Sequence, residues 1–359
     1  MPPDLASLPI LGICGWRGSG KTTLIAGLSR PLQERRLSVA VVKHDAHGFH
    51  VDTSGKDSDR IFIAGMDVSL QGPTEGIWRQ HCREGDDPAA VLLALAAQYD
   101  LVLIEGYKQL PAAKVWLLCE GEKAVPTEVG PVLDVLAPGV DRVARLMAIL
   151  DEWLPRQWLR TPVFGCVLIG GKSSRLGQPK HLLGRLDRTW LDTAVDALRA
   201  VAKQVVIVGA GEVPERLRTL ERLPDAPDTA GPLAGLLAAM RWAPWASWLV
   251  AACDMPHLSV EALHWLLATR TPGNWATVPR LAPDAPLEPL LAHYDFRARS
   301  LLERQAARGD YRIAGIATCP KVSTPQVPAP LACAWHDVDT RDDLEAMGLS
   351  SPIPFSEDR

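Results

Sequence analysis

Two glycine-rich stretches decide the fold of this chain: GWRGSGKTTL at residues 15–24 and LIGGKSSRLGQPK at residues 168–180. Each follows an apolar run that is predicted to be a buried β-strand, and each precedes helix-forming sequence. A glycine-rich turn between a strand and a helix is typical of phosphate-binding loops. The sequence therefore predicts two α/β domains that each handle a nucleotide or another phosphate.

Length and composition agree with two ordinary globular domains. The chain has 359 residues, 47% of them hydrophobic and 22% charged, with a net charge of -4. This balance gives no general attraction to nucleic acid. The apolar runs are too short to span a membrane, and the seven cysteines form no CxxC pair. We expect a cytoplasmic protein with neither nucleic acid nor membrane among its partners.

Alternation of apolar strands with helical segments predicts an α/β protein with two doubly wound domains. The first, at residues 1–152, is expected to resemble P-loop NTPases. Residues 151–162 carry two prolines and mixed charge, and residues 153–162 are predicted to be a linker. The second domain, at residues 163–349, is expected to be Rossmann-like. Residues 350–359 are predicted to be a disordered tail.

The first glycine-rich loop matches the G-x-x-x-x-G-K-[ST] pattern position for position. In such loops the backbone N–H groups surround phosphate oxygens, the lysine reaches the β- and γ-phosphates, and the hydroxyl that follows binds Mg²⁺. The spacing predicts a nucleotide site formed by Gly15, Gly18, Ser19, Gly20, Lys21, Thr22 and Thr23.

A second strand of the first half, in DLVLIEGYK at residues 100–108, ends in an acid. At the carboxyl end of a parallel strand, Glu105 would face the phosphates or their metal ion. The alternative is an ordinary carboxylate at a strand end. We predict that Thr22 and Glu105 bind Mg²⁺ in this half.

These two motifs and VVKHDAHGFHVDTSGKDSDRIFIAG at residues 41–65 occur in the order found in one family. Residues 10–150 resemble the molybdopterin-guanine dinucleotide biosynthesis adaptor proteins (MobB-like). The resemblance implies a GTP-binding P-loop domain, with weak GTP hydrolysis, that assists a guanylyltransferase.

The second glycine-rich loop is not a second P-loop, because Cys166 stands where that pattern needs glycine. It fits the nucleotidyltransferase pattern G-G-x-S-x-R-x-G-x-x-K instead. Arg175 and Lys180 would place positive charge on the phosphates at the point where pyrophosphate leaves. The pattern is filled by Gly170, Gly171, Ser173, Arg175, Gly177 and Lys180.

Acidic residues complete this second site. The strand in WLVAACDMP, at residues 248–256, ends in Asp254, which is placed to hold Mg²⁺. Asp225 and Asp228 precede a helix expected from Pro232. The alternative for each acid is a strand end or a helix cap.

Residues 163–349 resemble the molybdenum cofactor guanylyltransferases (MobA-like). By matching motif positions, the resemblance implies that Asp225, with Asp228 as its competitor, contributes to the nucleoside site. It implies that Asp254 holds Mg²⁺. The remaining GTP contacts that it implies are Leu168, Ile169, Gly170, Gly171 and Lys180.

Together the two resemblances imply a fused protein that transfers GMP from GTP to Mo-molybdopterin and releases pyrophosphate. Arg175, Lys180 and Asp254 are the expected catalytic residues. Molybdoenzymes or their chaperones are the expected protein partners. One alternative is a cytidylyltransferase, against which Gly170-Gly171 argues. The other is a GTP-regulated chaperone that delivers the cofactor.

Overall fold

The computed structural model describes residues 5–45, 51–82, 87–130, 132–170, 179–185, 188–338 and 340–346. They form two compact units. One, the N-terminal unit, comprises Ile10–Leu95 and Leu101–Ile149. The other, the C-terminal unit, comprises Ala96–Asp100 together with the described residues up to Pro9 and those from Leu150 onward.

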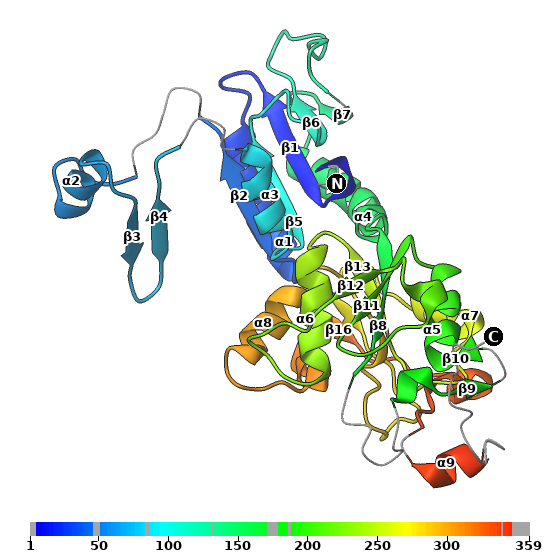
Figure 1. The fold of residues 1–359 in the computed structure, drawn as a ribbon. Coiled ribbons are helices and arrows are strands. Elements are labelled where there is room, and N and C mark those ends of the chain that lie inside the picture. The colour runs from blue at the N-terminus through cyan, green and yellow to red at the C-terminus, as the bar shows by residue number, and fades with distance from the viewer. Residues whose placement is uncertain are drawn as a thin grey trace. The chain divides into compact units, whose positions relative to one another are not determined.

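A five-stranded sheet forms the centre of the N-terminal unit (Figure 1), and every neighbouring pair of its strands is parallel. Because the strands are parallel, their carboxyl ends meet at one edge, where the phosphate loop begins. In spatial order the strands are β2 (Val39–Lys43), β5 (Leu101–Glu105), β1 (Ile10–Gly15), β6 (Ala113–Leu117) and β7 (Val132–Leu136).

Three helices accompany this sheet: α1 (Lys21–Glu34), α3 (Pro88–Ala96) and α4 (Arg142–Leu159). Helix α1 buries Leu24, Leu28 and Leu32, whose spacing of four residues places them on one face. The predicted linker is helical as far as Leu159, because it forms the end of α4.

Helix α2 (Asp57–Ile63) packs with an antiparallel hairpin, β3 (Val68–Gln71) and β4 (Gly76–Arg79). Arg79 connects the two parts. It donates a hydrogen bond to Asp59 at 2.9 Å, and its guanidinium lies 3.8 Å from the ring centre of Phe62.

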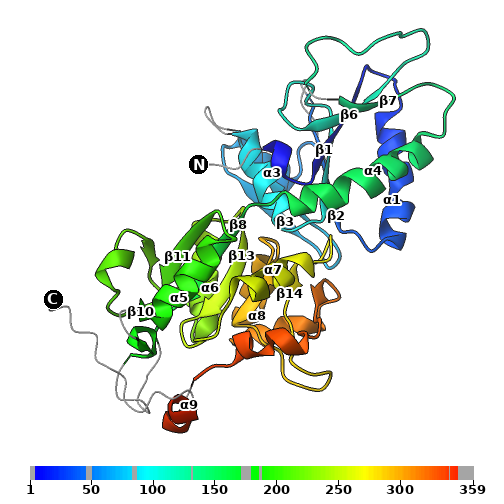
Figure 2. The same ribbon diagram turned by 90° about the vertical axis from the view of Figure 1, so that its right-hand side faces the viewer.

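The C-terminal unit contains a seven-stranded sheet (Figure 2). The first four strands are parallel to one another, and β15 runs antiparallel to both of its neighbours. In spatial order the strands are β12 (Glu221–Leu223), β11 (Gln204–Val208), β8 (Val163–Leu168), β13 (Ser247–Ala252), β15 (Leu291–Tyr294), β14 (Ala276–Thr277) and β16 (Val322–Ser323).

Helices cover both faces of this sheet, which confirms the predicted doubly wound α/β class. One hydrophobic core joins the sheet to α6 (Pro232–Trp242) and α8 (Ala298–Ala306). A second core joins the opposite face to α5 (Trp190–Arg199) and α7 (Val260–Ala268). Side chains alternate along a strand, so β8 gives Cys166 to the first core and Val167 to the second.

The remaining elements of the described residues are short. They are the hairpin β9 (Gly184–Arg185) and β10 (Arg188–Thr189), helix α9 (Arg341–Ala346), and the 3₁₀ turns η1 (Leu5–Ser7), η2 (Lys180–Leu182), η3 (Glu215–Leu217), η4 (Ile313–Thr318) and η5 (Ala329–Trp335). None of the helices described is both long and apolar enough to cross a membrane. The predicted tail at 350–359 lies outside the described residues.

Asp100 explains why a segment from the first half of the sequence packs within the C-terminal unit. Its carboxylate is fully buried and accepts a hydrogen bond from the indole of Trp275 at 2.9 Å. Lys321 Nζ lies 2.9 Å from the other carboxylate oxygen. A buried carboxylate requires such partners, so residue 100 is fixed by side chains from far along the chain.

Candidate functional site

The loop between β1 and α1 has the conformation that a phosphate cradle needs. Gly15, Gly18 and Gly20 all have positive φ, at 153°, 80° and 87°. A Cβ atom on Gly15 would lie 2.5 Å from Ser19 Oγ and 2.7 Å from the carbonyl oxygen of Leu117. Only glycine fits at this position, which explains the first glycine of the motif.

Lys21 lies folded over this loop. Its ammonium donates to the carbonyl oxygens of Trp16 at 2.8 Å and of Gly15 at 3.2 Å. Gly20 precedes α1 and supplies no side-chain cap, so the first N–H groups of the helix are available to an anion. The loop therefore combines a lysine, a helix N-terminus and flexible glycines.

Glu105 and Thr22 meet at the carboxyl edge of the sheet. The hydroxyl of Thr22 donates to Glu105 Oε1 at 2.9 Å, and Lys43 Nζ lies 3.5 Å from the same oxygen. A hydroxyl and a carboxylate beside a phosphate loop are the oxygen donors that Mg²⁺ prefers. The donor chemistry fits the metal ion that the sequence predicts here.

Arg142, at the start of α4, was not predicted from the sequence. Its guanidinium donates to the carbonyl oxygens of Ser19 at 2.7 Å, Leu118 at 2.5 Å and Leu136 at 3.1 Å. It thus ties the phosphate loop to the ends of β6 and β7. No local pattern indicates this role, because Arg142 lies more than a hundred residues from the loop in sequence.

In the C-terminal unit, a pocket of about 420 Å³ opens where β8, β11 and β13 end. This is the edge at which parallel α/β sheets bind ligands. The pocket contains Leu168, Ile169 and Gly170, as the sequence predicts, together with two predicted acids. Its lining is Leu168, Ile169, Gly170, Val208, Asp225, Gly231, Pro232, Gly235, Ala252, Cys253, Asp254 and Leu290.

Lys180 and Asp254 form an ion pair at this pocket. Lys180 Nζ lies 2.8 Å from Asp254 Oδ2, and each side chain is 18% exposed. Lys180 begins η2 and Asp254 follows β13, so the fold joins residues that are 74 positions apart. The other predicted members of this loop, Gly171, Ser173, Arg175 and Gly177, lie outside the described residues.

The two competing acids, Asp225 and Asp228, have different surroundings. Asp225 lines the pocket, and burial raises the pKa of its carboxyl group. Asp228 instead accepts two hydrogen bonds from Arg241, at 2.8 and 3.0 Å, on the surface. Of the two, Asp225 shares the pocket with Asp254. Carboxylate oxygens are ligands that Mg²⁺ prefers, so the donor chemistry of the pocket fits the metal ion that the sequence predicts at Asp254.

The cysteines near this pocket are not reactive thiolates. Burial and the neighbouring charge of Asp254 raise the pKa of Cys253 to about 12. Burial raises the pKa of Cys166 as well, and the charge of Asp225 adds to the effect. Both groups are therefore thiols at neutral pH, so among the described residues the charge at the pocket comes from its carboxylates and Lys180.

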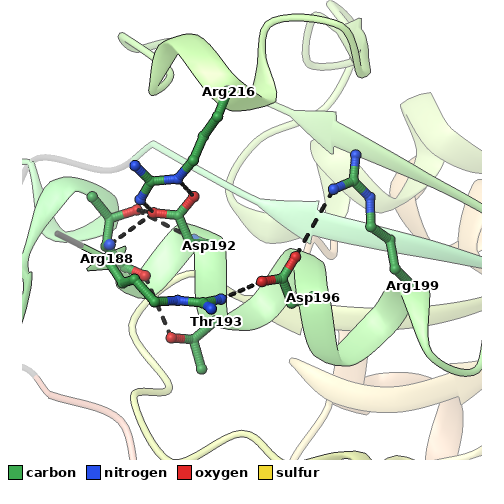
Figure 3. A network of polar contacts seen from close by, with 7 residues as sticks. Arg188, Asp192, Thr193, Asp196, Arg199 and Arg216 are labelled. Carbon is green, nitrogen blue, oxygen red and sulfur yellow. Dashed lines mark hydrogen bonds and ion pairs between the residues drawn. The ribbon is translucent and has the colours of Figure 1, made fainter.

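A polar network fixes the start of α5, shortly after η2 (Figure 3). Thr189 and Asp192 form a capping box, and Arg216 donates two hydrogen bonds to the carboxylate of Asp192. Burial raises the pKa of Asp192, but hydrogen bonds from Arg216 and Thr189 outweigh it, so the pKa is lowered overall. Arg188 pairs with Asp196 one turn further along. The network holds the helix that follows the second glycine-rich loop.

Comparison with known proteins identifies a family for each half of the chain. The family described as "Molybdopterin guanine dinucleotide synthesis protein B" matches residues 10–135, and the family described as "MobA-like NTP transferase domain" matches residues 165–318. A molybdopterin-guanine dinucleotide biosynthesis adapter protein of Haemophilus influenzae is 33% identical over 164 residues, which cover 41% of this chain and 90% of that protein.

The second half has relatives of its own. A probable molybdenum cofactor guanylyltransferase of Bacillus mycoides is 31% identical over 140 residues, which cover 38% of this chain and 69% of that protein. This chain belongs to both families. The crystal structure of molybdopterin-guanine dinucleotide biosynthesis protein A from Archaeoglobus fulgidus is 28% identical, with a TM-score of 0.43, over 51% of this chain and 95% of that protein.

The first half of the chain is thus an adapter domain, and the second half is a MobA-like nucleotidyltransferase domain of molybdenum cofactor biosynthesis. The pocket beside Lys180 and Asp254 lies in the transferase half. The loop with Lys21 and Thr22 lies in the adapter half.

Proposed function

We propose that the transferase half moves GMP from GTP to Mo-molybdopterin, and that the adapter half binds GTP with Mg²⁺. The observation that supports the transfer is the pocket at the carboxyl edge of the sheet. There Gly170, Asp225 and Asp254 line one cavity, and Lys180 contacts Asp254. Such a pocket offers backbone for the phosphates, a cation for their charge and carboxylates for a metal ion.

The reaction is a single displacement at phosphorus. An oxygen of the terminal phosphate of Mo-molybdopterin attacks the α-phosphorus of GTP. The bond from this phosphorus to the oxygen that bridges to the β-phosphate breaks, and pyrophosphate leaves with the bonding electrons. The nucleophile is already anionic, so no general base is required, and catalysis depends on positioning and electrostatics.

Several residues at the pocket, and Arg175 of the second glycine-rich loop, have roles in this proposal. Gly170, with φ at 110°, lets the backbone approach the nucleotide closely. Lys180, together with Arg175, stabilises the charge that develops on the phosphates. Asp254 would hold Mg²⁺, which neutralises phosphate charge when it is bound. Asp225 would contact the nucleoside.

In the adapter half, Lys21 would leave its carbonyl partners and bind the β- and γ-phosphates. Thr22 and Glu105 would hold Mg²⁺, and slow GTP hydrolysis is a further expectation. We propose that this half assists the delivery of nucleotide or cofactor to molybdoenzymes or their chaperones. A cytoplasmic location stays a prediction from the sequence.

Product analysis tests the proposal. The full-length chain is incubated with Mg²⁺ and GTP, CTP or ATP, with and without Mo-molybdopterin, and the products are identified by mass spectrometry. Formation of the guanine dinucleotide alone supports the proposal. A cytosine dinucleotide would instead show a cytidylyltransferase, and orthophosphate without any dinucleotide would show that only the adapter half acts on nucleotides.

A further inference from the structure

The contact between Lys180 and Asp254 occupies one oxygen of the carboxylate that is expected to hold the metal ion. The ammonium lies 2.8 Å from Oδ2, and both side chains are largely buried, at 18% exposure each. A Mg²⁺ ion bound to a carboxylate oxygen sits about 2.1 Å from it. Two cations cannot share that position, because they would repel each other strongly where water screens little.

An anion that enters the site competes with Asp254 for the ammonium of Lys180. A nucleoside triphosphate supplies that anion, and its own oxygens also bind the metal ion. When the triphosphate enters, one movement of Lys180 would place its ammonium on the phosphates and free the carboxylate. The metal and the nucleotide would then bind better together than separately.

We propose that Lys180 is the counter-ion of Asp254 in the nucleotide-free protein and makes the site select the metal–nucleotide complex over the free metal ion. This inference rests on the proposed role of the pocket as a nucleotide site. It makes Lys180 a specificity-determining residue as well as a phosphate ligand. By linkage, the metal raises nucleotide affinity by the same factor as the nucleotide raises metal affinity.

Mn²⁺ binding without nucleotide tests the proposal directly. The full-length chain is titrated with Mn²⁺, and free Mn²⁺ is followed by its electron paramagnetic resonance signal. Lys180→Gln removes the competing charge at similar size, so we expect it to bind Mn²⁺ about tenfold more tightly than the wild type. Lys180→Arg keeps the charge and is expected to bind as the wild type does.

A second substitution locates the effect. The adapter half also carries candidate metal ligands, and the double variant Lys180→Gln/Asp254→Asn keeps them while it removes the carboxylate. We expect the double variant to lose the tighter Mn²⁺ binding of Lys180→Gln. Unchanged or weaker Mn²⁺ binding by Lys180→Gln would overturn the proposal, and so would a gain that persists in the double variant. Thermal unfolding of each variant verifies that it is folded.

The effect of GTP on Mn²⁺ binding provides a further test. Addition of GTP is expected to tighten Mn²⁺ binding by a larger factor in the wild type than in Lys180→Gln. If GTP tightens Mn²⁺ binding equally in both proteins, Lys180 does not move from Asp254 to the triphosphate. Dinucleotide formation by the wild type reports separately on the proposed function. The two ideas are therefore distinguishable, because the Mn²⁺ titration needs neither Mo-molybdopterin nor turnover.

Discussion

The hydroxyl of Thr22 donates a hydrogen bond of 2.9 Å to Glu105, and this bond joins the phosphate loop to the strand beside it. Thr22 belongs to the first turn of α1, and Glu105 ends β5. Two motifs that are 83 residues apart in sequence therefore meet at one edge of the sheet. Their oxygens form a single candidate metal site.

Glu105→Gln replaces a carboxylate oxygen by an amide nitrogen and removes the negative charge. Mg²⁺ is expected to raise the affinity of the adapter half for GTP. We expect the factor of this increase to be about tenfold smaller in the variant, because one charged metal ligand is lost. Calorimetry with and without Mg²⁺, in an Asp254→Asn background that silences the other site, measures the effect. Glu120→Gln changes an exposed acid of the same unit and is the matched control. The same Mg²⁺ enhancement in both variants would exclude Glu105 as a ligand.

Asp225→Asn and Asp228→Asn form a second matched pair. Asp225 lines the pocket, whereas Asp228 is held by Arg241 on the surface. We expect Asp225→Asn to raise the KM for GTP about tenfold, since a group that contacts the bound substrate is changed. Asp228→Asn is expected to leave KM within about twofold, the usual scale for a surface substitution. Steady-state kinetics decides between them, and the reverse result would make Asp228 the nucleoside contact.

Gly209 follows β11 at the edge where the pocket opens. Its φ is 115°, and a Cβ atom there would lie 1.9 Å from the carbonyl oxygen of Ile169. Gly209→Ala is expected to destabilise the C-terminal unit by about 2–4 kcal/mol. The backbone at Ile169 must move away from the added Cβ atom, and the new alanine must adopt a strained φ. Gly309→Ala, in the same unit, is the control: φ of Gly309 is 78°, but nothing lies within 4 Å of the added atom. It is expected to cost only about 1 kcal/mol. Urea unfolding compares the two, and equal losses would contradict the steric argument.

The buried side chain of His293, in β15, makes the free energy of unfolding depend on pH. Burial, with the charges of Arg270 and Arg297 nearby, holds its pKa well below the ordinary value. The folded state therefore keeps His293 neutral while the unfolded chain gains a proton below about pH 6.5. Stability is full above that pH and falls as the pH is lowered, by at most about 1.4 kcal/mol per pH unit for this group.

His293→Gln tests this linkage. Urea unfolding at pH 7.5 and at pH 5.5 is expected to show a smaller difference in unfolding free energy in the variant than in the wild type. His336→Gln changes an exposed histidine and serves as the control. If His293→Gln and the wild type lose the same stability between the two pH values, His293 is not the group responsible.

Much of the fold was predictable, because it depends on short-range patterns. Apolar runs predicted β1, β8 and β13, and the helices expected after the two glycine-rich loops are α1 and α5. These elements are long, buried and bounded by residues of strong conformational preference. The same patterns placed Glu105 and Asp254 at strand ends.

Other features depend on residues that are distant in sequence, which a local pattern cannot show. Arg142 contacts Ser19, from which it is 123 residues distant in sequence. Asp100 looks like an ordinary residue before a strand, yet Trp275 makes it a buried acceptor. The difference between Asp225 and Asp228 appears only when Arg241 is in place.

The central claim is that the pocket with Asp254 transfers GMP from GTP to Mo-molybdopterin. Its most direct test is pyrophosphate release from GTP and Mg²⁺, measured with and without Mo-molybdopterin in the wild type and in Asp254→Asn. We predict release by the wild type that requires Mo-molybdopterin, and a loss of about a hundredfold or more in the variant at an unchanged melting temperature. Absence of release by the wild type, or equal release by the folded variant, would contradict the claim.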